Sequence, residues 1–117
     1  MKQEEQNALI ELFAKYLEEC GLSGKTLIHY PKAVDVYIPT YIRKHLDPNF
    51  ECFYNLKVAD IKLLYNQLEK SNYWEKEIAR KTWKLRLKAI EYYISFKEKM
   101  KKSTALLLRK NHRVGHT

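Results

Sequence analysis

Glycine, proline and cysteine are scarce in this chain, and it has no long apolar run. Its 117 residues include 3 Gly and 3 Pro, too few for the many tight turns of an all-β domain. No stretch approaches the roughly 18 apolar residues of a membrane span, so we expect no membrane segment and a cytoplasmic location. Cys20 and Cys52 lack the close spacing of a zinc or redox motif, and we expect both to be buried thiols in a reducing compartment.

The residues that are present fit one helical domain with unevenly distributed charge. Hydrophobic residues make up 45% of the chain, and a domain of this size buries roughly two-thirds of its unfolded surface. Residues 76–117 contain 13 Lys+Arg against 3 Asp+Glu, whereas residues 1–75 contain 9 against 11. The formal charge of +8 is therefore a property of the C-terminal third. It indicates either an anionic partner or a lysine-rich surface that only maintains solubility.

An amphipathic pattern predicts a first helix from about Glu4 to Cys20. Gly21 follows it, and a glycine at that place can adopt the left-handed conformation that ends a helix. Ser23 is then expected to cap the second helix with its hydroxyl. The apolar side chains expected to face the core from the first helix are Ala8, Leu9, Leu12, Phe13, Tyr16 and Leu17.

The second helical segment, Gly24 to about His45, contains two prolines. Pro31 and Pro39 each remove a backbone hydrogen bond, so we expect kinks or short breaks, with Pro39 in the first turn of a new helix. A loop is predicted over residues 47–55, because Asp-Pro-Asn at its start is a turn signal. The loop side chains expected to pack on the core are Phe50, Phe53 and Tyr54.

Two further helices are predicted, one from about Val58 to Lys70 and one from roughly Glu77 to Lys101, joined by a connection at 71–76. The later helix combines a basic face with an apolar stripe. The stripe is expected to contain Ala79, Trp83, Leu87, Ile90 and Ile94, widened by Ile78, Leu85, Ala89, Tyr93 and Phe96. We therefore expect an all-α fold, a compact bundle of four main helices in a domain at 1–102. A basic tail or linker at 103–117 can add a short helix.

Three segments of the chain form an ordered set of motifs. The first is 13–17 (Phe-Ala-Lys-Tyr-Leu) followed by 21–30 (Gly-Leu-Ser-Gly-Lys-Thr-Leu-Ile-His-Tyr). The second is 58–68, which begins Val-Ala-Asp-Ile, and the third is Thr-x-x-x-Arg-Leu-x-Ala-Ile-x-x-Tyr-x-x-Phe at 82–96. In order and spacing these segments resemble the core-binding domain of phage integrases and other tyrosine recombinases, a SAM-like helical module. Proline at position 31 departs from the uninterrupted helix of that family.

The resemblance implies a module that holds duplex DNA at a recombination site through its second and fourth helices, in a bacterial or phage-encoded protein associated with the nucleoid. Matching positions imply DNA contacts by Lys25, Thr26, His29 and Lys32 in the second segment and by Arg80, Lys81, Lys84, Arg86 and Lys88 in the fourth helix. The implied partners are double-stranded DNA and either a recombinase catalytic domain or another copy reached through the C-terminal tail. Related helical modules precede nuclease domains in restriction and mobile-element proteins, and this alternative stays open.

The sequence contains no recognisable catalytic or metal-binding constellation. The resembled family needs a nucleophilic tyrosine, two arginines and a histidine or lysine in a separate catalytic domain, whereas the 9 tyrosines here are scattered through amphipathic patterns. His112 and His116 have a zinc-like spacing, but their co-ligands would have to be the distant Cys20 and Cys52. We expect no enzyme activity, no cofactor and no metal. The rival hypothesis is a helical protein-interaction or regulatory module.

Overall fold

The structure, a computed structural model, describes residues 3–71 and 79–115, with side chains described as far as Lys101. The predicted all-α class is confirmed, since no strand occurs in these ranges. Its elements are α1 (Gln3–Glu19), α2 (Thr26–Lys32), the π-helix η1 (Ala33–Tyr37), α3 (Ile38–His45), α4 (Val58–Lys70) and α6 (Arg80–Gly115). The predicted connection at 71–76 lies almost entirely outside the described residues.

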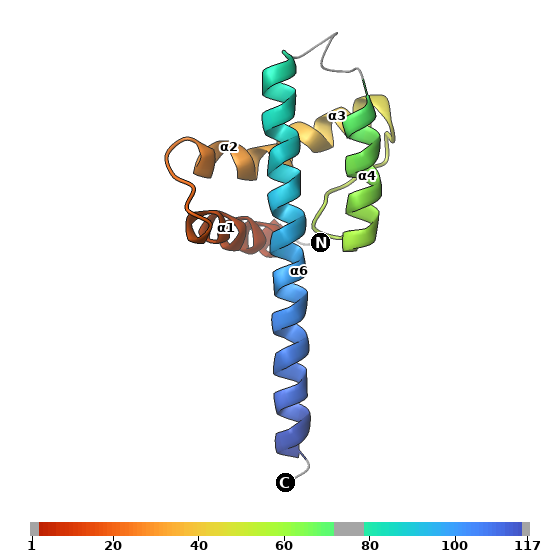
Figure 1. Ribbon diagram of the computed structural model, residues 1–117. Coiled ribbons are helices and arrows are strands. Elements are labelled where there is room, and N and C mark those ends of the chain that lie inside the picture. Colours follow the sequence, from red (N-terminus) through yellow and green to blue (C-terminus); the bar gives the residue numbers. More distant parts are fainter. Residues whose placement is uncertain (1–2, 72–78, 116–117) are drawn as a thin grey trace.

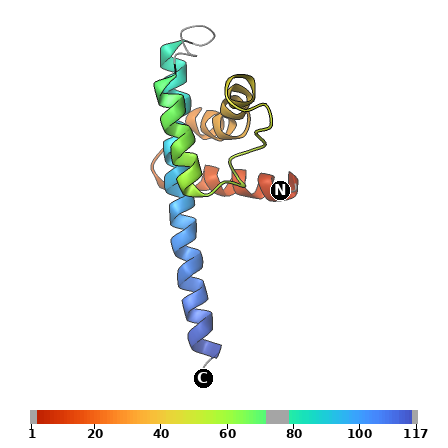
Figure 2. The ribbon, with the colours of Figure 1, turned by 90° about the vertical axis from the view of Figure 1, so that its right-hand side faces the viewer.

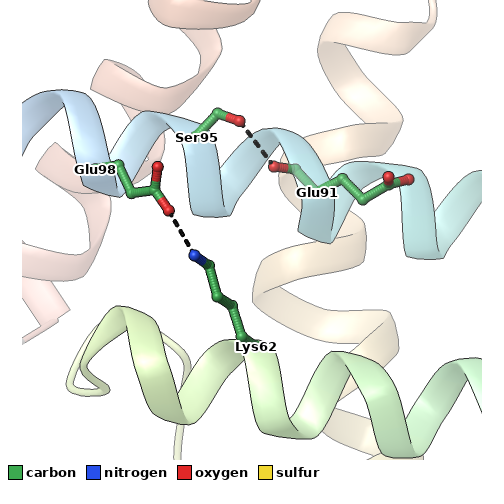
Figure 3. A network of polar contacts seen from close by, with 4 residues as sticks. All are labelled: Lys62, Glu91, Ser95 and Glu98. Atoms are coloured by element: carbon green, nitrogen blue, oxygen red, sulfur yellow. Dashed lines mark hydrogen bonds and ion pairs between the residues drawn. The ribbon is translucent and has the colours of Figure 1, made fainter.

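The long helix α6 organises the bundle (Figure 1). Helix α4 runs antiparallel beside its first half, while α1 and α2 cross it, and the second half of α6 extends beyond the other helices. Figure 2 shows α1 and the α2–α3 run on one side of the layer formed by α4 and α6. Within that layer an exposed ion pair connects α4 to α6, with 3.0 Å between Lys62 Nζ and Glu98 Oε1 (Figure 3). In the same view Ser95 donates its hydroxyl to the carbonyl of Glu91.

The core lies between the inner faces of all these helices. Phe13 packs edge-on against Tyr93, with ring centroids 5.3 Å apart, and Tyr41 contacts the ring of Trp83 at 5.2 Å. Each large apolar side chain that is fully buried stabilises the fold by roughly 1.5–3 kcal/mol. The buried hydrophobic residues are Phe13, Leu17, Ala33, Val34, Ile38, Tyr41, Ile42, Cys52, Phe53, Tyr54, Ile61, Leu68, Trp83, Leu87, Ala89, Ile90, Tyr93 and Phe96.

The end of α1 follows from one glycine, as predicted. Gly21 has φ +90°, a conformation that costs a glycine little. Its N–H bonds the carbonyl of Glu18, and the N–H of Leu22 bonds that of Leu17 at 3.1 Å. These two bonds satisfy carbonyls that the helix end leaves unpaired.

The prediction that Ser23 caps the second helix is wrong. Gly24 also adopts a left-handed conformation, at φ +64°, and α2 begins only at Thr26, after Lys25. No side-chain hydrogen bond caps this helix. Backbone bonds instead close the turn, from Leu27 N–H to the carbonyl of Gly24 at 3.2 Å. Ser23 therefore lies two residues before the N-cap position, which Lys25 occupies.

The two prolines bend the second segment without interrupting it. A π-turn, η1, follows Pro31 at the end of α2, and the N–H of Ile38 reaches the carbonyl of Ala33 five residues back. Pro39 lies in the first turn of α3, as predicted. Pro39 has no N–H, so it forms no backbone hydrogen bond to the preceding turn. The wider π-turn before it therefore breaks no hydrogen bond at that position. The expected kink is therefore a π-turn.

The predicted loop after α3 is confirmed. The N–H of Asn49 bonds the Asp47 carboxylate at 2.9 Å, and Arg43 holds the loop by donating to the carbonyls of Phe50 and Glu51. Phe53 is fully buried, so the loop contributes to the core. The helix that follows, α4, has the predicted bounds.

The last helix is longer than predicted. Its expected end at Lys101 is wrong, because α6 continues to Gly115 in place of a separate short helix. No glycine or proline occurs between 102 and 114, so nothing in the sequence stops the helix there. The predicted start at Glu77 lies outside the described residues.

Several apolar residues expected in the core are exposed. Leu12 is 48% exposed and Leu85 is 51% exposed, because the buried stripe of each helix is narrower than predicted. Ala8 and Ala79 also face solvent. Cys20 is exposed, whereas Cys52 is buried as predicted. The exposure of Cys20 follows from its place just after the last residue of α1.

Candidate functional site

A groove of about 450 Å³ lies between α2, η1 and the first half of α6. It brings residues 25–37 together with residues 82–86, which lie at least 45 positions later in the sequence. The groove is lined by side chains that include Lys25, Thr26, His29, Tyr30, Tyr37, Thr82, Leu85 and Arg86. None of its lining residues is acidic. We refer to it below as the α2/α6 groove.

Arg86 is the best-positioned cation of this groove. Its guanidinium carbon lies 4.3 Å from the ring centroid of Tyr37, a stacking contact worth roughly 0.5–2 kcal/mol. Stacking restricts the guanidinium to one plane while leaving its N–H donors at the edge of that plane. The side chain is half-buried. The contact with Tyr37 therefore anchors the Arg86 side chain at the groove.

The position of Tyr37 depends on the π-turn. Tyr37 is the last residue of η1, and π-turns inside helices occur frequently at functional sites. Sequence reasoning missed this residue, since it lies between the first resemblance motif, which ends at Tyr30, and the second, which begins at Val58. A proline two residues after it was the available signal of irregular helix geometry.

Hydroxyl groups accompany the cations. Tyr30 lies in the groove wall, and its ring packs against Tyr92 with centroids 5.8 Å apart, which joins α2 to α6. Burial raises the pKa of Tyr30, with smaller contributions from Tyr92 and Glu91. The phenol therefore stays protonated at neutral pH and is available as a donor. Thr26 and Thr82 add two aliphatic hydroxyls.

The structure separates the nine residues implied to contact DNA into two sets. Lys25, Thr26, His29 and Arg86 meet in the α2/α6 groove. The other five are exposed on the same two segments, namely Lys32, Arg80, Lys81, Lys84 and Lys88. Lys81, Lys84 and Lys88 recur at intervals of three and four residues, so they share one face of α6. The exposed cations extend the positive surface beyond the groove.

The groove has the chemistry of an anion-binding surface. Guanidinium and ammonium groups bind phosphate through charge-assisted hydrogen bonds, and the threonine and tyrosine hydroxyls add neutral donors. In the described part of the chain, no three His, Cys, Asp or Glu side chains gather where they could hold a metal ion. The side chains of His112 and His116 lie outside the described residues. None of the helices over 3–71 and 79–115 is long and apolar enough to cross a membrane.

Comparisons with known protein families, curated proteins and solved structures give no match. Function therefore has to be argued from the groove and from the sequence motifs.

Proposed function

We propose that this protein is a DNA-binding module of a phage integrase-like or tyrosine recombinase-like protein. It grips duplex DNA with the α2/α6 groove and the basic face of α6. The observation that carries the proposal is the meeting of Lys25, His29 and Arg86 in one groove without an acidic residue. In this proposal the module has no catalytic site of its own. It works at the nucleoid of a bacterial cell with a separate catalytic domain.

The binding energy comes mainly from phosphate neutralisation. Each cation that engages a phosphate releases about one counterion, so affinity falls steeply as salt is added. Such contacts position a protein on DNA without reading its sequence. Arg86 is the one groove cation whose planar donors are fixed by stacking, so it is the residue best suited to a two-point contact with a phosphate or with a guanine edge.

The surrounding cations have a different role. Lys81, Lys84 and Lys88 are exposed on α6, and a flexible ammonium group acts as a point charge. These lysines accelerate encounter with DNA and add to the salt dependence. They contribute less to a fixed geometry than Arg86 does.

A titration of labelled duplex DNA at several salt concentrations tests this function. We expect measurable binding at low salt and a linear fall of log affinity with log salt. Reversing two charges, Lys84→Glu with Lys88→Glu, should weaken binding much more than Lys15→Glu with Lys62→Glu. All four lysines are exposed. Lys62→Glu also breaks the ion pair with Glu98, so circular dichroism should verify that the control variant remains folded.

Of the two alternatives, only the protein-interaction module predicts a different result. A protein-interaction or regulatory module, including one that contacts a partner through the tail at 103–117, predicts no DNA binding even at low salt. Equal effects of the two pairs of charge reversals would indicate attraction without a defined site. The N-terminal module of a restriction or mobile-element nuclease would bind DNA in the same way, and only its natural catalytic partner distinguishes it.

A further inference from the structure

A second groove, of about 650 Å³, lies where α6 leaves the bundle. Its apolar floor includes Leu9, Phe96 and Met100, and its lysines are Lys57, Lys97 and Lys101. No acidic residue lines it. The α2/α6 groove does not share a single residue with it. We call this surface the α1/α6 groove.

The lysines of the α1/α6 groove lack carboxylate partners in the described part of the chain. Lys97 is half-buried and donates to the backbone carbonyls of Tyr54 and Leu56. Its pKa is lowered by burial, since a charged group loses hydration there. Lys57 and Lys101 are exposed. The groove therefore presents positive charge that nothing within the described residues neutralises.

Apolar surface continues from this groove toward the outer face of α1. A smaller hollow of about 220 Å³ shares Phe96 and Met100 with it, and Leu12, Lys15, Tyr16, Glu19 and Lys99 line the rest. Glu19 and Lys99 form an ion pair there, at 3.2 Å. Leu12 is 48% exposed. The apolar side chains of the two hollows, which include Leu9, Leu12 and Met100, form a connected patch, and adjoining exposed apolar groups are typical of interaction sites.

Negative charge borders the same surface on α1. Glu5 is exposed, and it has no ion-pair partner among the described residues. Glu5 precedes Leu9 by one helical turn, so the two lie on the same side of α1. The apolar surface thus has the unpaired carboxylate of Glu5 on its α1 side and unpaired lysines at the start of α4 and on α6.

We propose that the α1/α6 groove binds a second copy of this chain. A two-fold axis brings the same patch of two copies together, so Glu5 of one copy faces the lysines of the other. The apolar centre supplies buried contact area, and the opposite charges at its edges set the orientation. The chain itself carries both halves of this complementary surface. The proposal does not depend on DNA binding.

Sedimentation equilibrium without DNA tests the proposal, over about 5 µM to about 500 µM chain. We expect a monomer–dimer equilibrium. Met100→Glu, which places a charge in the apolar centre, should raise the dimer dissociation constant about tenfold or more. The matched control is Leu63→Glu, because Leu63 is 63% exposed on α4 and lines neither groove. Circular dichroism of both variants verifies that they remain folded.

A charge exchange tests the orientation. Lys101→Glu should weaken the dimer, and adding Glu5→Lys to it should restore most of the lost affinity. Higher salt should weaken the wild-type dimer, since exposed charges are screened. A chain that stays monomeric at the highest concentration overturns the proposal, even if the groove binds some other acidic protein. Equal effects of Met100→Glu and Leu63→Glu, or no restoration in the double variant, would also contradict it.

Discussion

The two grooves beside α6 both contain cations, yet their surroundings differ. In the α2/α6 groove Lys25, His29 and Arg86 lie among threonine and tyrosine hydroxyls. In the α1/α6 groove the lysines border an apolar floor that includes Phe96 and Met100. Hydroxyl donors and a stacked guanidinium suit phosphate oxygens, whereas an apolar floor suits the side chains of another protein chain. Net charge alone therefore does not identify the partner of a basic surface.

Trp83→Ala should have the largest effect, because it removes the buried side chain that holds α6 against α3. Trp83 is 2% exposed and contacts the ring of Tyr41. Truncating a buried tryptophan costs about 3–5 kcal/mol of unfolding free energy, and both grooves should be lost together. Urea denaturation followed by circular dichroism measures this. A loss no larger than that of the surface substitution Lys84→Ala would show that α6 is not packed as described.

Arg86→Ala tests the DNA-binding role of the α2/α6 groove independently of the α1/α6 groove. Losing a charged hydrogen-bonding group at a binding site costs about 1.5–3 kcal/mol, so DNA affinity should fall by roughly tenfold or more. Arg86→Lys keeps the positive charge but lacks the planar guanidinium, so it should lose less affinity than Arg86→Ala and more than none. Lys57→Ala, in the other groove, is the control and should leave DNA affinity almost unchanged. Anisotropy titrations at one fixed salt concentration give the comparison, and equal losses for Arg86 and Lys57 would contradict a defined DNA site.

Stability should decline at alkaline pH. Burial, together with Glu91 and Glu69, raises the pKa of Tyr65 to about 12, and burial also raises the pKa of Tyr54 and Tyr93. In the unfolded chain these phenols ionise near pH 10. Their stabilising contribution is therefore complete below about pH 10 and is lost as the pH rises toward the folded values. The lowered pKa of Lys97 acts in the opposite direction, but at lower pH, below its ordinary pKa of 10.5.

To test this prediction, the urea concentration at the midpoint of unfolding is measured at several pH values between about 8 and 11. Tyr65→Phe should make the decline shallower, because phenylalanine has no proton to lose. A midpoint that rises with pH across this range would show that the lysine effect exceeds that of the tyrosines.

Lys62→Ala should have the smallest effect. Its ion pair with Glu98 joins α4 to α6, but the two side chains are 58% and 43% exposed. Exposed ion pairs contribute about 0–1 kcal/mol, so the unfolding free energy should change within that range. The same urea experiment tests this, and a larger loss would mean that the pair does more than join two solvated surfaces.

Much of the fold could be predicted from local sequence patterns. The bounds of α4, the end of α1 at Gly21 and the burial of Trp83 and Tyr93 follow from helical periodicity and glycine geometry. The length of α6 could not, because the short apolar run at 105–108 looked like a separate helix. The exposure of Leu12 and Leu85 depends on how widely the neighbouring helices cover each face.

The candidate site was predicted in part. Lys25, Thr26, His29 and Arg86 share one groove, but which of the nine implied residues would meet depended on how α2 crosses α6. Tyr37 was missed because a π-turn sets its position, and periodicity at 3.6 residues per turn does not describe such a turn. The α1/α6 groove was also missed, since its residues come from three segments without a shared motif.

Chemical-shift mapping by NMR most directly tests the claim that DNA binds in the α2/α6 groove. Isotope-labelled protein is titrated with a short duplex, and the backbone amide signals are followed. We predict that the largest changes occur at 25–30 and 82–88, with little change at 56–59 and 96–101. Changes concentrated at the latter two segments, or no changes at low salt, would contradict the account.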